Sequence, residues 1–160
     1  MNDITSELPR HATKKYKDRS VSGIKQIIIH HSATLPNSED GRRDAEAFAR
    51  YHVESNDWPG IGYHYVIGKD GTVNKTNNNT IVSYHAGNAN PASLGVCLVG
   101  NFDLGEPPEI QWSAAVDLTL MLMGAYGIPE NRVIGHWEVP ANKSCPGRLF
   151  DVDKFRRCLI

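Results

Sequence analysis

Two histidines and one cysteine have the residue types and spacing that most readily suggest a chemical site. His30 follows a run of isoleucines, His136 follows a short apolar segment, and Cys145 comes nine residues after His136. Two imidazoles and one thiolate are a known ligand set for catalytic zinc, with water in the fourth position. Taken singly, such residues are more often core histidines with satisfied hydrogen bonds or small buried thiols. The zinc interpretation therefore depends on a fold that brings the three together.

Both histidines are expected where a strand ends. The β-branched run from Ile24 to Ile29 predicts a buried strand that ends at His30 and His31, and residues 133–134 predict a short strand before His136. Apolar spacing and turn residues predict the other elements: helices at 42–55, 112–126 and 149–159, a hairpin from 63 to 73, and a buried strand at 94–99. This order predicts a single α/β domain, with a central mixed sheet flanked by helices.

Composition limits the classes of partner. The 160 residues suit one domain, and 40% hydrophobic with 22% charged residues excludes disorder of the whole chain. With 17 Lys and Arg against 18 Asp and Glu, the net charge of −1 gives no broad basic surface. Nucleic acids and anionic membranes attract clustered positive charge. We therefore expect no nucleic-acid partner and no membrane insertion.

The segment 1–22 is polar and precedes the predicted domain at 23–160. It lacks the apolar stretch of a secretory signal, and no apolar run approaches the roughly 20 residues of a spanning helix. The three cysteines, Cys97, Cys145 and Cys158, cannot all pair with one another. These features predict a protein made in the cytoplasm, with a polar N-terminal arm and at least one cysteine that is free or a metal ligand.

Six motifs carry a family resemblance. They are His-His-Ser-Ala-Thr at 30–34, Gly-Tyr-His-Tyr-Val-Ile at 62–67, His-Ala-Gly-Asn at 85–88, Leu-Gly-Val-Cys-Leu-Val-Gly-Asn-Phe at 94–102, Gly-His-Trp-Glu-Val-Pro at 135–140 and Lys-Ser-Cys-Pro-Gly at 143–147. In this order they resemble the zinc-dependent N-acetylmuramoyl-L-alanine amidases of the type-2 amidase family, which includes phage amidase-type lysozymes and animal peptidoglycan recognition proteins. The resemblance covers about residues 24–145 and implies the fold of that family.

The resemblance also implies roles for single residues. His30, His136 and Cys145 are expected to bind one Zn²⁺ per chain, which lowers the pKa of a bound water and polarises a carbonyl. Tyr63 is expected to orient or deprotonate that water, and Lys143 to stabilise the developing oxyanion. Without the resemblance, a half-buried strand tyrosine and a solvated lysine are the default interpretations.

Further residues are expected near the substrate. His85 matches the family histidine beside the substrate, with a plain loop hydrogen bond as the alternative. Three aromatic rings are candidates to line a groove for the glycan or stem peptide: Trp58, Tyr84 and Trp137. Packing against other residues is the alternative for all three. A fourth ring, Tyr51, is also a candidate, but packing is the preferred interpretation for it. Cys97 replaces a glutamate of the cytosolic muropeptide-recycling amidases and, in its apolar strand, is expected to be a buried core thiol.

The resulting functional hypothesis is a monomeric peptidoglycan hydrolase. It would cleave the amide bond between the lactyl group of N-acetylmuramic acid and L-alanine of the stem peptide, and as a phage or prophage endolysin it would reach the wall after release. One alternative is a non-catalytic peptidoglycan-binding module, a class whose members lose the cysteine ligand. Another is a metal-free thiol hydrolase that uses Cys145 with His136 as base. That reaction leaves His30, Tyr63 and Lys143 without a role.

Overall fold

A mixed β-sheet forms the centre of the molecule. The computed structural model describes residues 1–139 and 144–160. Its six-stranded sheet consists of β1 (Asn2–Asp3), β3 (Gln26–His31), β4 (Tyr65–Ile67), β5 (Val73–Lys75), β7 (Ser93–Leu98) and β8 (Val133–Gly135). The spatial order is β1-β5-β4-β7-β3-β8, and the four strands β4, β7, β3 and β8 run parallel. A second sheet pairs β2 (Lys17–Asp18) with β6 (Ile81–Val82). The predicted mixed sheet is confirmed.

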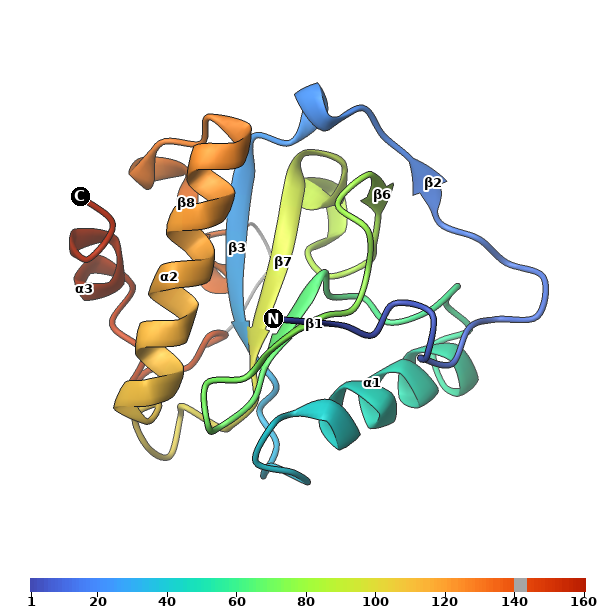
Figure 1. Cartoon of the computed structure of the whole chain (residues 1–160), viewed down its shortest axis with the longest axis horizontal. Coiled ribbons are helices and arrows are strands. Elements are labelled where there is room, and N and C mark those ends of the chain that lie inside the picture. The colour runs from blue at the N-terminus through green and yellow to red at the C-terminus, as the bar shows by residue number, and fades with distance from the viewer. Residues whose placement is uncertain (140–143) are drawn as a thin grey trace.

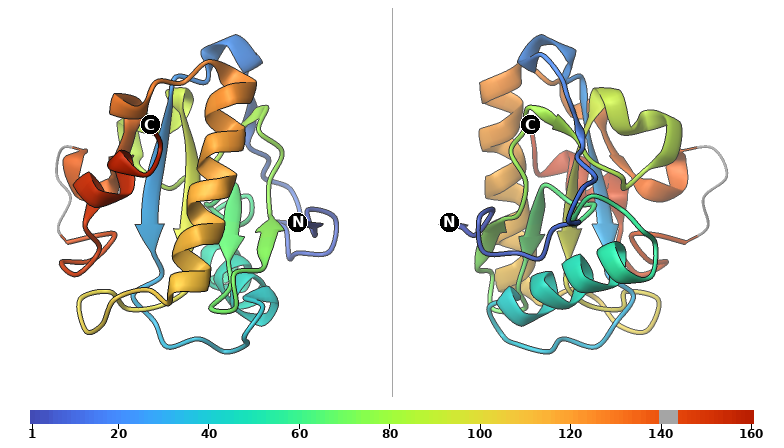
Figure 2. Two further views of the ribbon diagram at one scale, coloured as in Figure 1. Left: turned by 60° about the vertical axis from the view of Figure 1, so that its left-hand side comes forward. Right: turned by 90° about the vertical axis from the view of Figure 1, so that its right-hand side faces the viewer.

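Helices cover both faces of the sheet (Figures 1 and 2). Ala45 and Ala49 of α1 (Arg42–Glu54) pack on one face, whereas α2 (Glu109–Tyr126) and α3 (Val152–Arg157) pack on the other. Short 3-10 turns join the elements in the described ranges: η1 (Val21–Gly23), η2 (Gly87–Ala92), η3 (Glu130–Arg132) and η4 (His136–Glu138). None of the helices in the described part of the chain is long and apolar enough to cross a membrane.

The observed helix ends differ in part from those expected. Helix α2 begins at Glu109, three residues before the predicted start, directly after Pro108. Its end agrees with the prediction, because Gly127 adopts the left-handed conformation and its N–H bonds to the carbonyl of Met123. Helix α3 is shorter than predicted at both ends. Its start is set by the Asp151 side chain, which caps the N-terminus by accepting from the Lys154 N–H.

Strand alternation determines which residues of β3 reach the site. Ile27 and Ile29 belong to the core beneath α2, so the intervening residues point to the α1 face. His30 is in register with Cys97 of β7, which belongs to the core beneath α1. Because register partners in neighbouring strands point to the same face, the side chain of His30 also lies on the α1 side of the sheet.

The segment 1–22 packs against the rest of the chain. Ile4 and Leu8 are buried in the core beneath α1, and β1 lies beside β5 at the sheet edge. The Arg10 guanidinium donates to the Asn77 side chain at 2.8 Å, and the Tyr16 hydroxyl donates to the Gly60 carbonyl at 2.7 Å. The polar segment therefore wraps the domain and supplies part of its core.

Candidate metal centre

The three predicted ligands lie together at one end of the sheet. His30 is the penultimate residue of β3, and His136 begins η4 directly after β8. Because β3 and β8 are parallel neighbours, their carboxyl ends meet at the same edge. One ligand atom each from His30, His136 and Cys145 lies within 4.8 Å of the others. The centroids of the two histidine rings are 4.2 Å apart.

The spacing of these atoms suits a tetrahedral zinc ion. Zinc bonds of about 2.3 Å to sulfur and about 2.0 Å to nitrogen, at a tetrahedral angle, place the two ligand atoms about 3.5 Å apart. The Cys145 sulfur lies 3.7 Å from Nδ1 of His30. The donor set and its geometry therefore fit zinc with one coordination position left for water.

The protonation states of His30, His136 and Cys145 determine whether they can bind a metal. Burial lowers the pKa of His30 well below its usual range and that of His136 to about 4, so both imidazoles are neutral at pH 7 and able to bind a metal. Burial raises the pKa of the Cys145 thiol to about 12. A thiol with a raised pKa is not an activated nucleophile, and it needs a nearby cation to become a thiolate. This argues against the metal-free thiol hydrolase.

His31 has a different environment from its neighbour. Its Nδ1 accepts a hydrogen bond from the backbone N–H of Phe102 at 3.0 Å, and its ring lies 5.9 Å from the Phe102 ring. Only its carbonyl oxygen approaches the candidate centre, 3.9 Å from the Cys145 sulfur. The side chain of His31 is therefore not part of the ligand group.

Tyr63 lies beside the ligand group. Its ring centroid is 5.3 Å from that of His30, and its ring also packs against the rings of Phe48 and His52. The Tyr63 hydroxyl interacts with the Cys97 thiol, which is fully buried as expected. Burial raises the pKa of Tyr63 well above its usual range, so the hydroxyl is protonated at neutral pH. The predicted partner Lys143 lies outside the described residues.

Comparison with known proteins identifies the family. The N-acetylmuramoyl-L-alanine amidase family matches residues 19–148, which is most of the chain. The chain belongs to this family. The amidase is 35% identical over 135 residues to an endolysin of Enterobacteria phage K11, a match that covers 81% of the chain and 83% of that relative.

Two further relatives extend the comparison. Peptidoglycan-recognition protein LB of Drosophila melanogaster is 30% identical over 129 residues, covering 78% of the amidase and 55% of the relative. The Ph2119 endolysin of a Thermus scotoductus bacteriophage superposes with a TM-score of 0.80 and 26% identity, covering 99% of the amidase and 97% of that chain. The resemblance and the fold expected from the sequence are confirmed.

A cavity adjoins the candidate metal centre of the amidase. It has a volume of about 430 Å³ between α1 and the segment after β3, and Tyr63 forms part of its wall. The remaining lining combines polar and aromatic groups: Ser32, Thr34, Asn37, Ala47, Phe48, Tyr51 and His52. Tyr51, for which packing was the preferred interpretation, is 60% exposed and belongs to this wall.

The four predicted substrate residues of the amidase occupy three different places. Trp58 and Tyr84 meet edge to face with centroids 5.7 Å apart, so they form one aromatic cluster. Trp137 is 49% exposed and follows His136. His85 is buried, and its Nδ1 lies 3.0 Å from Nε2 of His30.

Sequence reasoning missed His52 as a site residue of the amidase. Its Nδ1 accepts from the Gly62 N–H at 3.0 Å, its ring packs on Trp58, and burial lowers its pKa to about 4. The available signal was its position on the apolar face of the predicted helix, four residues after Phe48.

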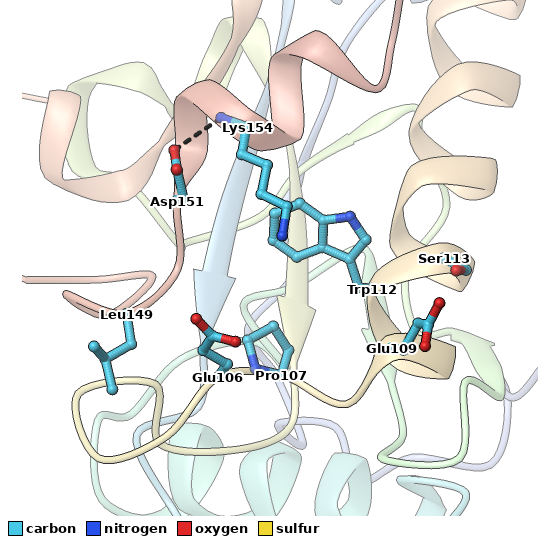
Figure 3. A pocket seen from close by; sticks show the side chains of 8 residues that line it. All are labelled: Glu106, Pro107, Glu109, Trp112, Ser113, Leu149, Asp151 and Lys154. Atoms are coloured by element: carbon cyan, nitrogen blue, oxygen red, sulfur yellow. Dashed lines mark hydrogen bonds between the residues drawn. The ribbon is translucent and has the colours of Figure 1, made fainter.

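A larger cavity lies on the other face of the sheet. It has a volume of about 600 Å³ and is bounded by α2, α3 and the segment before α2 (Figure 3). Its wall carries the carboxylates of Glu106, Glu109 and Asp151, and the Lys154 ammonium lies 5.4 Å from the Trp112 ring centroid. None of the described residues that line this cavity is a histidine or cysteine, so they lack the chemistry of the candidate metal centre.

Proposed function

We propose that the amidase is zinc-dependent and hydrolyses the amide bond between the lactyl group of N-acetylmuramic acid and L-alanine of the peptidoglycan stem peptide. One observation carries the proposal: His30, His136 and Cys145 meet within 4.8 Å, beside Tyr63, in a chain of the amidase family. Bound zinc would supply a water of lowered pKa and a polarised substrate carbonyl.

The protein residues have separate parts in this reaction. His30 and His136 offer neutral ring nitrogens because burial disfavours their protonated forms. Cys145 would hold the metal as a thiolate, with its thiol proton released to solvent. Tyr63, held by the rings of His30, Phe48 and His52, keeps its phenolic proton and orients the attacking water by hydrogen bonding. We therefore propose that Tyr63 acts on this water as a protonated phenol, by orienting it.

Lys143 supplies positive charge in this scheme. A fixed cation near the substrate carbonyl stabilises the oxyanion as the tetrahedral intermediate forms. The family pattern supports this role, since Lys143 stands two residues before the Cys145 ligand.

We assign the cavity beside Tyr63 to the substrate. Its wall presents hydroxyl and amide groups from Ser32, Thr34 and Asn37 opposite the aromatic surface of Phe48 and Tyr51. Amphipathic rings of this kind stack on sugars and apolar peptide groups, while the polar groups fix orientation. The aromatic pair of Trp58 and Tyr84, together with Trp137, is a candidate for further contacts with the peptidoglycan substrate.

The biological setting proposed for the enzyme is that of a phage or prophage endolysin. The endolysin of phage K11 aligns with 81% of this chain at 35% identity. The protein would be made in the cytoplasm and would act as a monomer on peptidoglycan after release. A purely recognising module is disfavoured because Cys145 and Tyr63 are both retained.

Product analysis tests the reaction. Purified cell walls are incubated with the wild-type protein and with Tyr63→Phe, and new amino termini and new reducing sugar ends are measured by chemical labelling. The proposal predicts new N-terminal alanine without new reducing ends, and much less of it with the variant. Binding to the wall without any new termini would identify a recognition module instead, and new reducing ends would identify a glycosidase.

A further inference from the structure

His85 has both ring nitrogens in hydrogen bonds within the protein. Its Nδ1 lies 3.0 Å from Nε2 of His30, and its Nε2 lies 3.2 Å from the hydroxyl oxygen of Ser93. The Ser93 hydroxyl in turn donates to the backbone carbonyl of Ala89 at 2.7 Å. His85 is 8% exposed and Ser93 is fully buried. These contacts form a continuous chain from Ala89 to His30.

The Ala89 carbonyl fixes the direction of every proton in this chain. A carbonyl oxygen only accepts, so the single hydroxyl proton of Ser93 goes to Ala89. Ser93 must then accept from Nε2–H of His85, which leaves Nδ1 of the neutral His85 ring as an acceptor. That acceptor receives Nε2–H of His30. Nδ1 of His30 is therefore without a proton, and it is the atom that lies 3.7 Å from the Cys145 sulfur.

The surrounding chain holds the His85 ring in place. A Cβ atom at Gly95 would lie 2.7 Å from Cγ and Nδ1 of His85, so only glycine leaves room for the ring there. The Asn90 side chain accepts from the backbone N–H groups of His85 at 3.0 Å and Ala86 at 2.7 Å. Backbone and side chain of His85 are thus both fixed before any ligand binds.

We infer that His85 is a positioning residue for the metal centre: by accepting Nε2–H of His30, with Ser93 and Ala89 behind it, it holds His30 with Nδ1 free and aimed at the ion. The inference rests on the proposed function, which makes His30 a zinc ligand. Histidine ligands commonly donate the N–H of their other ring nitrogen to a hydrogen-bond acceptor, and loss of that acceptor costs about 10- to 100-fold in metal affinity or activity. For His85 this role replaces the substrate contact expected from the sequence, because neither ring nitrogen is left for a substrate.

A first experiment reads the tautomers directly in the metal-free, full-length protein. Ring ¹⁵N chemical shifts and two-bond ¹H–¹⁵N correlations, assigned with single-histidine variants, distinguish a proton on Nε2 from one on Nδ1. The inference predicts Nε2–H for both His30 and His85, and retention of the His30 Nε2–H signal when zinc is added. A proton on Nδ1 of either ring, or zinc bound through Nε2 of His30, would overturn it.

A second experiment measures zinc affinity by competition with a chelator. His85→Leu removes the acceptor and should weaken zinc binding about 10- to 100-fold, while His85→Asn, whose amide oxygen replaces Nδ1, should restore much of the loss. Ser93→Ala should weaken binding by a smaller factor. The matched control is Ser83→Ala, because Ser83 is an equally buried serine whose hydroxyl contacts His64 and not His85.

The outcomes separate the inference from the proposed function. Unchanged zinc affinity in His85→Leu together with a raised KM would make His85 a substrate contact and would refute the positioning role. Failure of the wild-type protein to bind zinc would refute the proposed function, and the tautomer measurement would still decide the arrangement of His85 and His30.

Discussion

Nδ1 of His30 lies 3.7 Å from the sulfur of Cys145, although 115 positions separate the two residues in the sequence. Parallel pairing of β3 with β8 brings the ends of both strands to one edge, and the turn after β8 leads the chain back toward His30. The site is thus a product of sheet topology, because no local segment contains more than two of its three candidate ligands.

Substitutions of the adjacent residues His30 and His31 should differ in their effect on bound zinc. His30→Ala removes a ligand, so we expect loss of bound zinc and of activity together. His31→Asn is the matched control, since the His31 ring accepts from the Phe102 N–H and lies outside the ligand group. Zinc content by elemental analysis, with amidase activity, distinguishes them. Full zinc occupancy in His30→Ala would be incompatible with the assignment of His30 as a ligand.

Tyr63→Phe should retain zinc and lose turnover. The phenyl ring keeps the contacts with His30 and Phe48 but lacks the hydroxyl that we propose orients water. We therefore expect kcat to fall about 100-fold, in the range typical of a lost proton-handling group. Tyr65→Phe is the control, because the Tyr65 hydroxyl donates to Asn79 and its ring packs in the core beneath α2. A wild-type kcat in Tyr63→Phe would remove this tyrosine from the mechanism.

Stability should fall as the pH is lowered from about 6.5 toward about 4. Burial lowers the pKa of His64 to about 3 and that of His52 to about 4, below the usual value of about 6.5. Below pH 6.5 the unfolded chain therefore binds protons that the folded chain does not, and the fully buried His64 alone should cost about 2 kcal/mol at pH 5.

Urea unfolding of metal-free protein at pH 7 and pH 5 measures this effect. We expect a lower midpoint at pH 5 and a smaller difference between the two pH values in His64→Gln. An equal or higher midpoint at pH 5 would contradict the neutral, buried state of these histidines.

The N-terminal segment should contribute to stability. Ile4 is 1% exposed and packs beneath α1, so Ile4→Ala should lower the free energy of unfolding by about 2 to 5 kcal/mol. Val21→Ala, at a side chain that is 51% exposed, should change it by less than about 0.5 kcal/mol. Equal midpoints of urea unfolding for the two variants would show that the segment does not pack as described.

Much of the fold could be predicted from local patterns. The isoleucine run before His30 and the glycine after Tyr126 are strong signals for a buried strand and a helix end, and both predictions are confirmed. The burial of Ile4 and Leu8 could not be predicted, because isolated apolar residues in a polar segment show no periodicity.

The candidate site could be predicted less completely. The ligand types and their order were visible in the sequence, and the structure brings the three together. The hydrogen bonds of His85 to His30 and Ser93 depend on the path of a loop and on the space above Gly95. Neither composition nor spacing encodes such a path, so the sequence left a substrate contact and a loop hydrogen bond as open alternatives for His85.

Zinc titration of metal-free protein tests whether the amidase activity depends on zinc. The protein is stripped with a chelator, its metal content is verified, and release of N-terminal alanine from purified cell walls is followed as zinc is added back. We expect no release without metal and full recovery at one zinc ion per chain. Full activity of protein verified to be metal-free would contradict this expectation.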